Sequence, residues 1–192
     1  MQDCTNYKDS IFLPNPITQV ADMPYALYLS LQGKYFVGYA DNMEFDNERI
    51  AWAGLINPVK SGVNLHVYVW TVTNIGEAPL MAQIWLNTDP PGQAIRSELV
   101  TPANTALRPL PTPRVMLLQA NDVTLEPEGG VKAFTRRVIS EVTIASEEEG
   151  KLIFPPGGSF IIFLSNTETP HQTGAGRVAF GWWEEKVNED NK

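Results

Sequence analysis

Residues 51–87 read AWAGLINPVKSGVNLHVYVWTVTNIGEAPLMAQIWLN. Within them, Val63–Thr73 is the longest run rich in Val, Thr and aromatic residues, which fit a pleated, half-buried surface. A glycine turn at Gly62 precedes this run, and a tight turn leads from it to a further β-like run, Leu80–Leu86. The pattern predicts three successive strands, and we expect the rest of the chain to pair with or pack on this meander.

Both faces of the strand predicted at Val63–Thr73 carry large apolar residues. Because successive side chains of a strand point to opposite faces, one face should hold Leu65, Val67 and Val69, and the other His66, Tyr68, Trp70 and Val72. An antiparallel sheet with one face in water alternates apolar with polar residues, so both faces should be covered. The second face is covered either by the proline-rich segment 101–113 and the N-terminal arm, or by another subunit.

The whole chain has about ten short β-like runs between Gly- and Pro-rich turns, and no long segment with apolar residues at helical period. This predicts an all-β protein with a single antiparallel β-sandwich of jelly-roll type. Val63–Thr73 and Phe160–Leu164 should be central strands, because both are apolar on both faces. The predicted core consists of Leu65, Val67, Val69, Ile84, Leu86, Phe160, Ile162, Leu164, Val178 and Phe180.

The chain divides into three predicted parts. These are an irregular N-terminal arm (1–24), a β-sandwich domain (25–186) and a charged C-terminal tail (187–192). Within the domain, Tyr25–Leu31 and Lys34–Ala40 flank a Gln-Gly pair and are predicted to form a hairpin. A short helix is the alternative for the first of these runs, because Leu and Ala favour helices.

Composition excludes several classes of partner. The 192 residues carry a formal net charge of −8, which argues against nucleic acid and against anionic membrane surfaces. No run approaches the ~20 apolar residues that a membrane span requires. The single cysteine, Cys4, lies in a polar leader with no apolar run before it. We therefore expect a cytoplasmic protein, or one associated with a surface or particle without a signal peptide.

The residues that usually carry catalysis are sparse. The two histidines, His66 and His171, are far apart in sequence and lack the His-x-His spacing of a metal-binding strand, so neither is expected to bind metal. Cys4 has no histidine near it in sequence, and no Gly-x-Ser-x-Gly motif occurs. Glu184 and Glu185 are neighbours on a predicted strand, so they point to opposite faces and cannot act as a pair. We expect no enzyme activity, no cofactor and no metal.

The aromatic residues are more informative. Trp182 and Trp183 are adjacent on a predicted strand, so one should enter the core. The other should be exposed, covered by a loop or buried against a partner. The candidate interaction surface comprises Tyr68, Trp70, Trp85, Trp182 and Trp183. Such residues suit protein interfaces or sugar stacking, and simple burial under the proline-rich segment is the alternative.

A set of turn motifs follows in order along residues 50–185. They are Ile56-Asn57-Pro58, Ser61-Gly62-Val63-Asn64-Leu65, Thr101-Pro102-Ala103-Asn104-Thr105, Pro155-Pro156-Gly157-Gly158 within Leu152–Leu164, and Phe180-Gly181-Trp182-Trp183-Glu184. This order resembles an uncharacterised domain family of Gram-positive bacteria, and it is similar to small β-sandwich proteins found among phage virion genes. The resemblance implies a jelly-roll-like fold and a structural or surface role, and it supplies no catalytic residues.

Three functions follow as hypotheses. The first is a non-catalytic structural or assembly module, phage-derived or surface-associated, that acts through protein contacts. The second is a carbohydrate-binding module that uses sheet-face Trp and Tyr residues, and the third is an enzyme with a barrel-mouth site. For the first we expect a homo-oligomer, a trimer in preference to a dimer, because large exposed apolar faces are rare on soluble monomers and closed symmetry is the usual solution for one repeated patch.

Overall fold

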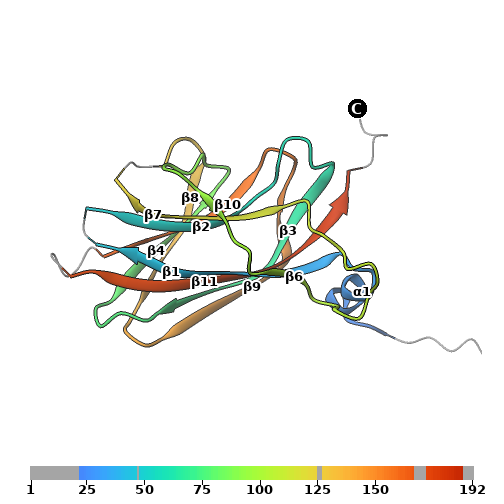
Figure 1. Cartoon of the computed structure of the whole chain (residues 1–192), viewed down its shortest axis with the longest axis horizontal. Coiled ribbons are helices and arrows are strands. Elements are labelled where there is room, and N and C mark those ends of the chain that lie inside the picture. The colour runs from blue at the N-terminus through green and yellow to red at the C-terminus, as the bar shows by residue number, and fades with distance from the viewer. Residues whose placement is uncertain (1–21, 47, 125–126, 167–171, 188–192) are drawn as a thin grey trace, which may run out of the picture.

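The computed structural model describes residues 22–46, 48–124, 127–166 and 172–187. In these residues the chain forms one helix and eleven strands, which confirms the prediction of an all-β antiparallel sandwich (Figure 1). The elements are α1 (Tyr25–Leu31), β1 (Tyr35–Phe45), β2 (Ile50–Ile56), β3 (Val63–Asn74), β4 (Leu80–Leu86), β5 (Ile95–Arg96), β6 (Val100–Pro102), β7 (Met116–Val123), β8 (Val131–Val138), β9 (Thr143–Phe154), β10 (Ser159–Ser165) and β11 (Gly174–Lys186).

The strands form two sheets that face each other. Sheet A has the order β6-β1-β11-β3-β9, and sheet B has the order β5-β7-β2-β10-β4-β8. The prediction of a meander over residues 51–87 is therefore wrong, because β2 and β4 lie in sheet B while β3 lies in sheet A. The turns were recognised correctly, but each carries the chain across the sandwich instead of back along the same sheet.

The core lies between the sheets. β10 is buried at every position, as its apolar FIIFL run predicts, and it lies between β2 and β4 in the middle of sheet B. β3 is interior to sheet A, between β11 and β9. The predicted core residues that are fully buried are Leu65, Val67, Ile84, Phe160, Ile162, Leu164, Val178 and Phe180. Leu86 is half-buried and packs against this core.

A β-bulge in β3 overturns the predicted face of Val69, Trp70 and Val72. Val67 pairs with Trp182 of β11 and Val69 pairs with Gly181, so Tyr68 is an extra residue without a pairing partner on that strand. An extra residue reverses the alternation of the side chains beyond it. Trp70 and Val72 consequently enter the core, while Val69 is turned to the outer face of sheet A, where it lines a groove.

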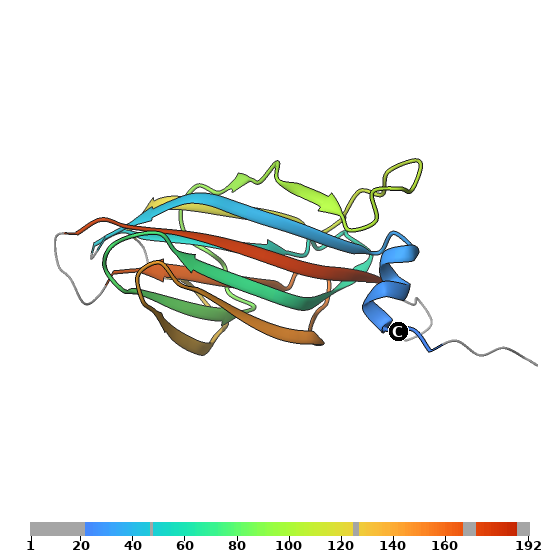
Figure 2. The same cartoon turned by 90° about the horizontal axis from the view of Figure 1, so that it is seen from below.

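The predicted hairpin at the start of the domain is also wrong, because Tyr25–Leu31 forms helix α1. Pro24 precedes the helix, and Gly33, with a φ of 70°, follows it. A glycine with positive φ just after a helix closes its last turn, here with the Lys34 amide donating to the carbonyl of Leu29 at 3.0 Å. Figure 2 shows α1 beyond one end of the strands of sheet A.

The outer face of sheet B is covered by the chain itself. A second apolar cluster there comprises Trp52, Ala120, Val123, Ile161 and Phe163. The indole Nε1 of Trp52 donates to the carbonyl of Pro91 at 2.8 Å, so the segment between β4 and β5 lies over this face. The proline-rich segment 101–113, by contrast, connects β6 in sheet A to β7 in sheet B and packs Leu107 and Pro111 beside Gly33.

Residues 1–21 of the predicted arm and residues 188–192 of the predicted tail lie outside the described residues, as do His171 and Cys4.

Candidate interaction surface

The five aromatic residues of the predicted interaction surface do not form one surface. Trp70 and Trp182 lie in the core and are 2% and 0% exposed. Tyr68 and Trp183 lie on the outer face of sheet A, and Trp85 packs against the second cluster on the outer face of sheet B. The bulge in β3 explains the burial of Trp70, since it turns this side chain inward.

Trp183 is covered by the chain's own helix. Its ring stacks on His66 at a centroid distance of 3.5 Å and meets the ring of Tyr25 edge-on at 5.6 Å. Gly150 closes a third side, because a Cβ there would lie 2.7 Å from the indole Nε1. The prediction offered exposure, coverage by a loop or burial against a partner for the second tryptophan; Trp183 is buried within the chain, but α1 and its neighbours cover it in place of the predicted loop.

His66 stacks on Trp183 and has a polar neighbour at each ring nitrogen. Its Nδ1 lies 3.2 Å from the Gly150 carbonyl, and its Nε2 lies 3.3 Å from the Glu185 carboxylate. The carboxylate of Glu184 points elsewhere, to the segment before β7, so the two adjacent glutamates do lie on opposite sides of β11. Among the described residues, no group of three or more His, Cys, Asp and Glu side chains is placed to hold a metal ion.

In helix α1 the side chain of Leu29 is buried, whereas the other large side chains are exposed. Leu29 is 2% exposed. Tyr25 meets Trp183 edge-on and stacks on Tyr28, but it remains 59% exposed. Leu27, Tyr28 and Leu31 are 48%, 47% and 51% exposed. We call these three residues the helix face. The seven residues of α1, YALYLSL, include no charged residue.

A groove runs along the outer face of sheet A. It has a volume of about 320 Å³ and crosses β1, β11 and β3, with residues before and within β6 forming one wall. We call it the outer groove; its side chains include Val37, Tyr39, Val69, Thr71, Leu99 and Ala179. None of the residues that line it is charged.

Two tyrosines lie next to this groove. The ring of Tyr35 meets the ring of Tyr68 edge-on at 5.4 Å. Gly181 leaves room for Tyr35, because a Cβ there would lie 2.5 Å from its hydroxyl oxygen and 2.7 Å from Val69. Burial raises the pKa of Tyr35 to about 12, with smaller contributions from Tyr68 and Glu147.

Glu184 fixes the chain where it enters sheet B. Its carboxylate accepts hydrogen bonds from the backbone amides of Arg114 and Val115, both at 2.9 Å, and from the indole Nε1 of Trp182 at 3.4 Å. Burial raises the pKa of this carboxyl group, and the hydrogen bonds oppose that shift only in part. Glu184 thus links the last strand to the end of the proline-rich segment.

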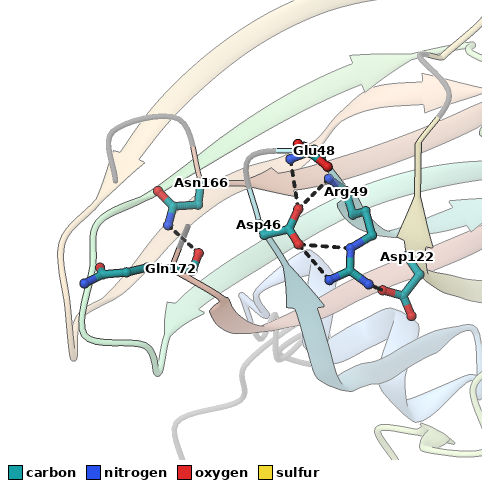
Figure 3. Close-up of polar contacts among 6 residues, drawn as sticks. All are labelled: Asp46, Glu48, Arg49, Asp122, Asn166 and Gln172. Carbon is teal, nitrogen blue, oxygen red and sulfur yellow. Dashed lines mark hydrogen bonds and ion pairs between the residues drawn. The ribbon is translucent and has the colours of Figure 1, made fainter. Parts of the chain in front are cut away.

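Ion pairs join Asp46, which directly follows β1, to Arg49 and join Arg49 to Asp122 of β7 (Figure 3). Asp46 accepts from the backbone amides of Glu48 and Arg49 and from the Arg49 guanidinium, at 2.7 to 2.9 Å. Arg49 also reaches Asp122 at 2.8 Å. The hydrogen bonds from Arg49 lower the pKa of Asp46. The carboxylates of Asp46 and Asp122 are thus both paired with Arg49.

Sequence reasoning did not identify the outer groove. The groove depends on the bulge at Tyr68, which turns Val69 outward, and on the small residues of β11 that form its floor. The sequence did contain one signal for the bulge, the run Glu147-Glu148-Glu149-Gly150. β9 pairs Leu152 with Val67 and Glu147 with Val69, so this run lies opposite the bulge in β3. A glycine inside a strand often marks a bulge, and Gly150 has a φ of 79°.

Across residues 22–187, apart from the gaps in the description, no helix has the length and apolar character that crossing a bilayer demands. Comparison of the chain with curated proteins and with solved structures finds no match. A family model does match, over residues 9–189, and it spans the whole sandwich together with part of the N-terminal arm. The chain therefore belongs to the family of unknown function DUF6143.

Proposed function

We propose that the sandwich is of jelly-roll type. In such a fold eight strands form two Greek keys over two sheets. Four antiparallel pairings support this: β1 with β11, β2 with β10, β3 with β9 and β4 with β8. The pairs are nested along the chain, because each later pair lies between the two strands of the pair before it. β6 and β7 then extend the two sheets, next to β1 and β2.

We propose further that the protein is a non-catalytic structural or assembly module that acts through protein–protein contacts. The observation that carries this is the helix face, in which Leu27, Tyr28 and Leu31 are each about half exposed at one end of the sandwich. Contiguous exposed apolar patches larger than a few hundred Å² are rare on soluble monomers and mark interaction sites. Burying such side chains against a partner removes apolar surface from water, which stabilises the contact by about 25 cal/mol per Å² before the cost of association.

The partner proposed is a second copy of the chain, in a homo-oligomer with a trimer favoured over a dimer. The similarity to phage virion proteins and a Gram-positive origin belong to this proposal, because they rest on the turn motifs of residues 50–185 alone. A place in the cytoplasm, or on the surface of a cell or particle, is part of the same proposal.

Carbohydrate binding is the second candidate. The observation in its favour is that Tyr35, Tyr39 and Tyr68 lie in or beside the outer groove on a sheet face. Aromatic rings on such a face suit sugar stacking. The tryptophans predicted for this role do not supply it, since Trp70 and Trp182 are in the core and Trp183 is beneath α1.

Two measurements separate these candidates. Tagged and untagged chains are co-expressed and purified on the tag, and the assembly proposal predicts that the untagged chain is recovered with the tagged one. The labelled protein is then applied to a glycan array beside a Tyr68→Ala variant. Recovery of the tagged chain alone, together with glycan binding that Tyr68→Ala abolishes, would replace the assembly role by the carbohydrate one.

A further inference from the structure

We infer that the N-terminal segment 9–21 occupies the outer groove of its own chain, with Ile11, Phe12 and Leu13 as the side chains that fill it. This segment lies outside the described residues, which begin at Asp22. The contact goes beyond the proposed assembly role, because it forms within one chain whether or not copies associate. The segment then covers the apolar outer face of sheet A.

The outer groove is an apolar recess that the described part of the chain leaves open. Its volume of about 320 Å³ is at the lower end of the range for ligand pockets, so we expect it to hold a few large side chains. Val37 and Leu99 line it and are 39% and 55% exposed. An antiparallel sheet with one face in water carries polar residues on that face. The apolar lining therefore indicates that a further segment covers the groove.

The described chain begins close to this groove and on the same face of sheet A. Helix α1 lies at the end of the strands of sheet A (Figure 2), and its first residue, Tyr25, meets Trp183 of the outer face edge-on at 5.6 Å. From Trp183 to Ala179 in the groove, β11 advances by four residues, or about 13 Å. Phe12 precedes Tyr25 by 13 residues, and a chain of that length spans up to about 45 Å. The segment therefore reaches the groove with length to spare.

The segment has the composition that the groove requires. Residues 10–21, SIFLPNPITQVA, contain three consecutive large apolar residues and no charged residue. The groove lining is also uncharged, so the contact buries no charge. The prolines at 14 and 16 disfavour a helix, because proline lacks the amide donor, and an extended segment fits a groove.

The extent of the family match joins this segment to the sandwich. The match begins at residue 9, two residues before Ile11, and continues through the whole sandwich. Residues 1–8, which are mostly polar, lie outside it. The boundary thus falls directly before the apolar run, as expected if that run packs on the domain.

Attachment favours the chain's own segment over any other apolar partner. A segment joined to its binding site by a short stretch of chain has an effective concentration in the millimolar range. An apolar segment of another protein must reach the groove from solution. A second copy must do so as well, against the repulsion between two chains that each carry a formal net charge of −8. At micromolar protein concentration the attached segment therefore outcompetes both.

Cross-linking within the whole chain tests this contact. Cys4, the single native cysteine, is replaced by Ser, and Ser10→Cys places a thiol beside the apolar run without altering it. Leu99→Cys places the second thiol on the groove wall. A short bis-maleimide joins the two thiols over a range of distances, and peptide mass spectrometry follows the rate. In a second series Asn15→Cys, on the other side of the apolar run, replaces Ser10→Cys.

The matched control replaces Leu99→Cys by Ile153→Cys. Ile153 is 53% exposed, close to the 55% of Leu99. It pairs with His66, whose ring stacks on Trp183, so it lies nearer to the start of α1 than the groove does. A segment with no preferred site would therefore react with Ile153→Cys at least as fast as with Leu99→Cys.

We expect cross-linking to Leu99→Cys to be at least about tenfold faster than to Ile153→Cys in one series or both, in a product with the 21.3 kDa mass of one chain. Adding Phe12→Asp should abolish this difference, because an apolar groove does not bury an unpaired carboxylate. Circular dichroism checks that each variant keeps the fold.

Equal or slower cross-linking to Leu99→Cys in both series overturns the inference, as does a difference that survives Phe12→Asp. A product of twice 21.3 kDa also overturns it, because the segment would then lie in the groove of a second copy. Each of these failures leaves the helix face and the proposed assembly role standing.

Discussion

Replacing Glu184 by Ala should loosen the junction between the proline-rich segment and sheet B. The substitution leaves the backbone amides of Arg114 and Val115 without their acceptor in a buried site. A buried donor that loses its partner costs about 1–3 kcal/mol. Taking about 1.5 kcal/mol for each amide, and little for the long bond to Trp182, the free energy of unfolding should fall by about 3 kcal/mol.

Two variants serve as controls. Glu184→Gln keeps a carbonyl oxygen where Oε1 accepts both amides, so it should cost under about 1 kcal/mol. Glu185→Ala removes the neighbouring carboxylate, which is half exposed, and should also cost under about 1 kcal/mol. Urea unfolding followed by tryptophan fluorescence measures all three.

The pH dependence supplies a second readout. Burial raises the pKa of Glu184, so the folded state binds the proton more tightly than the unfolded state does. The wild type should therefore lose this part of its stability as the pH rises above the unfolded-state pKa toward the folded-state value, and Glu184→Gln should not. Equal stability of Glu184→Ala and wild type at neutral pH would refute the role given to this carboxylate.

Three further predictions concern the sandwich itself. Ile162→Ala, in the fully buried strand β10, should cost ~2–5 kcal/mol in urea unfolding, and a cost under ~1 kcal/mol would mean that its face is misassigned. Gly150→Ala should lower the free energy of unfolding by about 1–3 kcal/mol, because the φ of Gly150 is 79° and the new methyl group would meet Trp183. An unchanged melting temperature would contradict this prediction. Tyr35 should ionise near pH 12, because burial raises its pKa from the ordinary tyrosine value of 10.0. The wild type should therefore lose stability as the pH rises from the unfolded-state pKa of Tyr35 to that value, and Tyr35→Phe should not. An absorbance titration in which Tyr35→Phe removes a transition near pH 10 would contradict this.

The parts of the fold that the sequence predicts are those set by local pattern. Side chains alternate between the two faces along an unbroken strand. The FIIFL run of β10 is apolar on both faces, so burial on both faces could be predicted, and it is observed. The same rule fails in β3 beyond Tyr68, where one extra residue reverses it. Nothing within Val63–Thr73 marks that position, since the cause lies in the partner strands β11 and β9.

Local turn chemistry and tertiary contacts decide the remaining differences. Tyr25–Leu31 has residues that suit either a helix or a strand, and the glycine with positive φ that follows favours the helix. The sequence also shows that Trp182 and Trp183 point to opposite faces, but only the structure shows that both are buried and that α1 covers the second. The candidate interaction surfaces are therefore the helix face and the outer groove, and not the tryptophans.

The molar mass of the wild-type protein in solution tests the central claim most directly, because assembly through its own copies is what the exposed helix face supports. Light scattering coupled to size exclusion should give three times the 21.3 kDa of one chain, or twice that value for a dimer. A sharp peak at 21.3 kDa across micromolar concentrations would contradict the account.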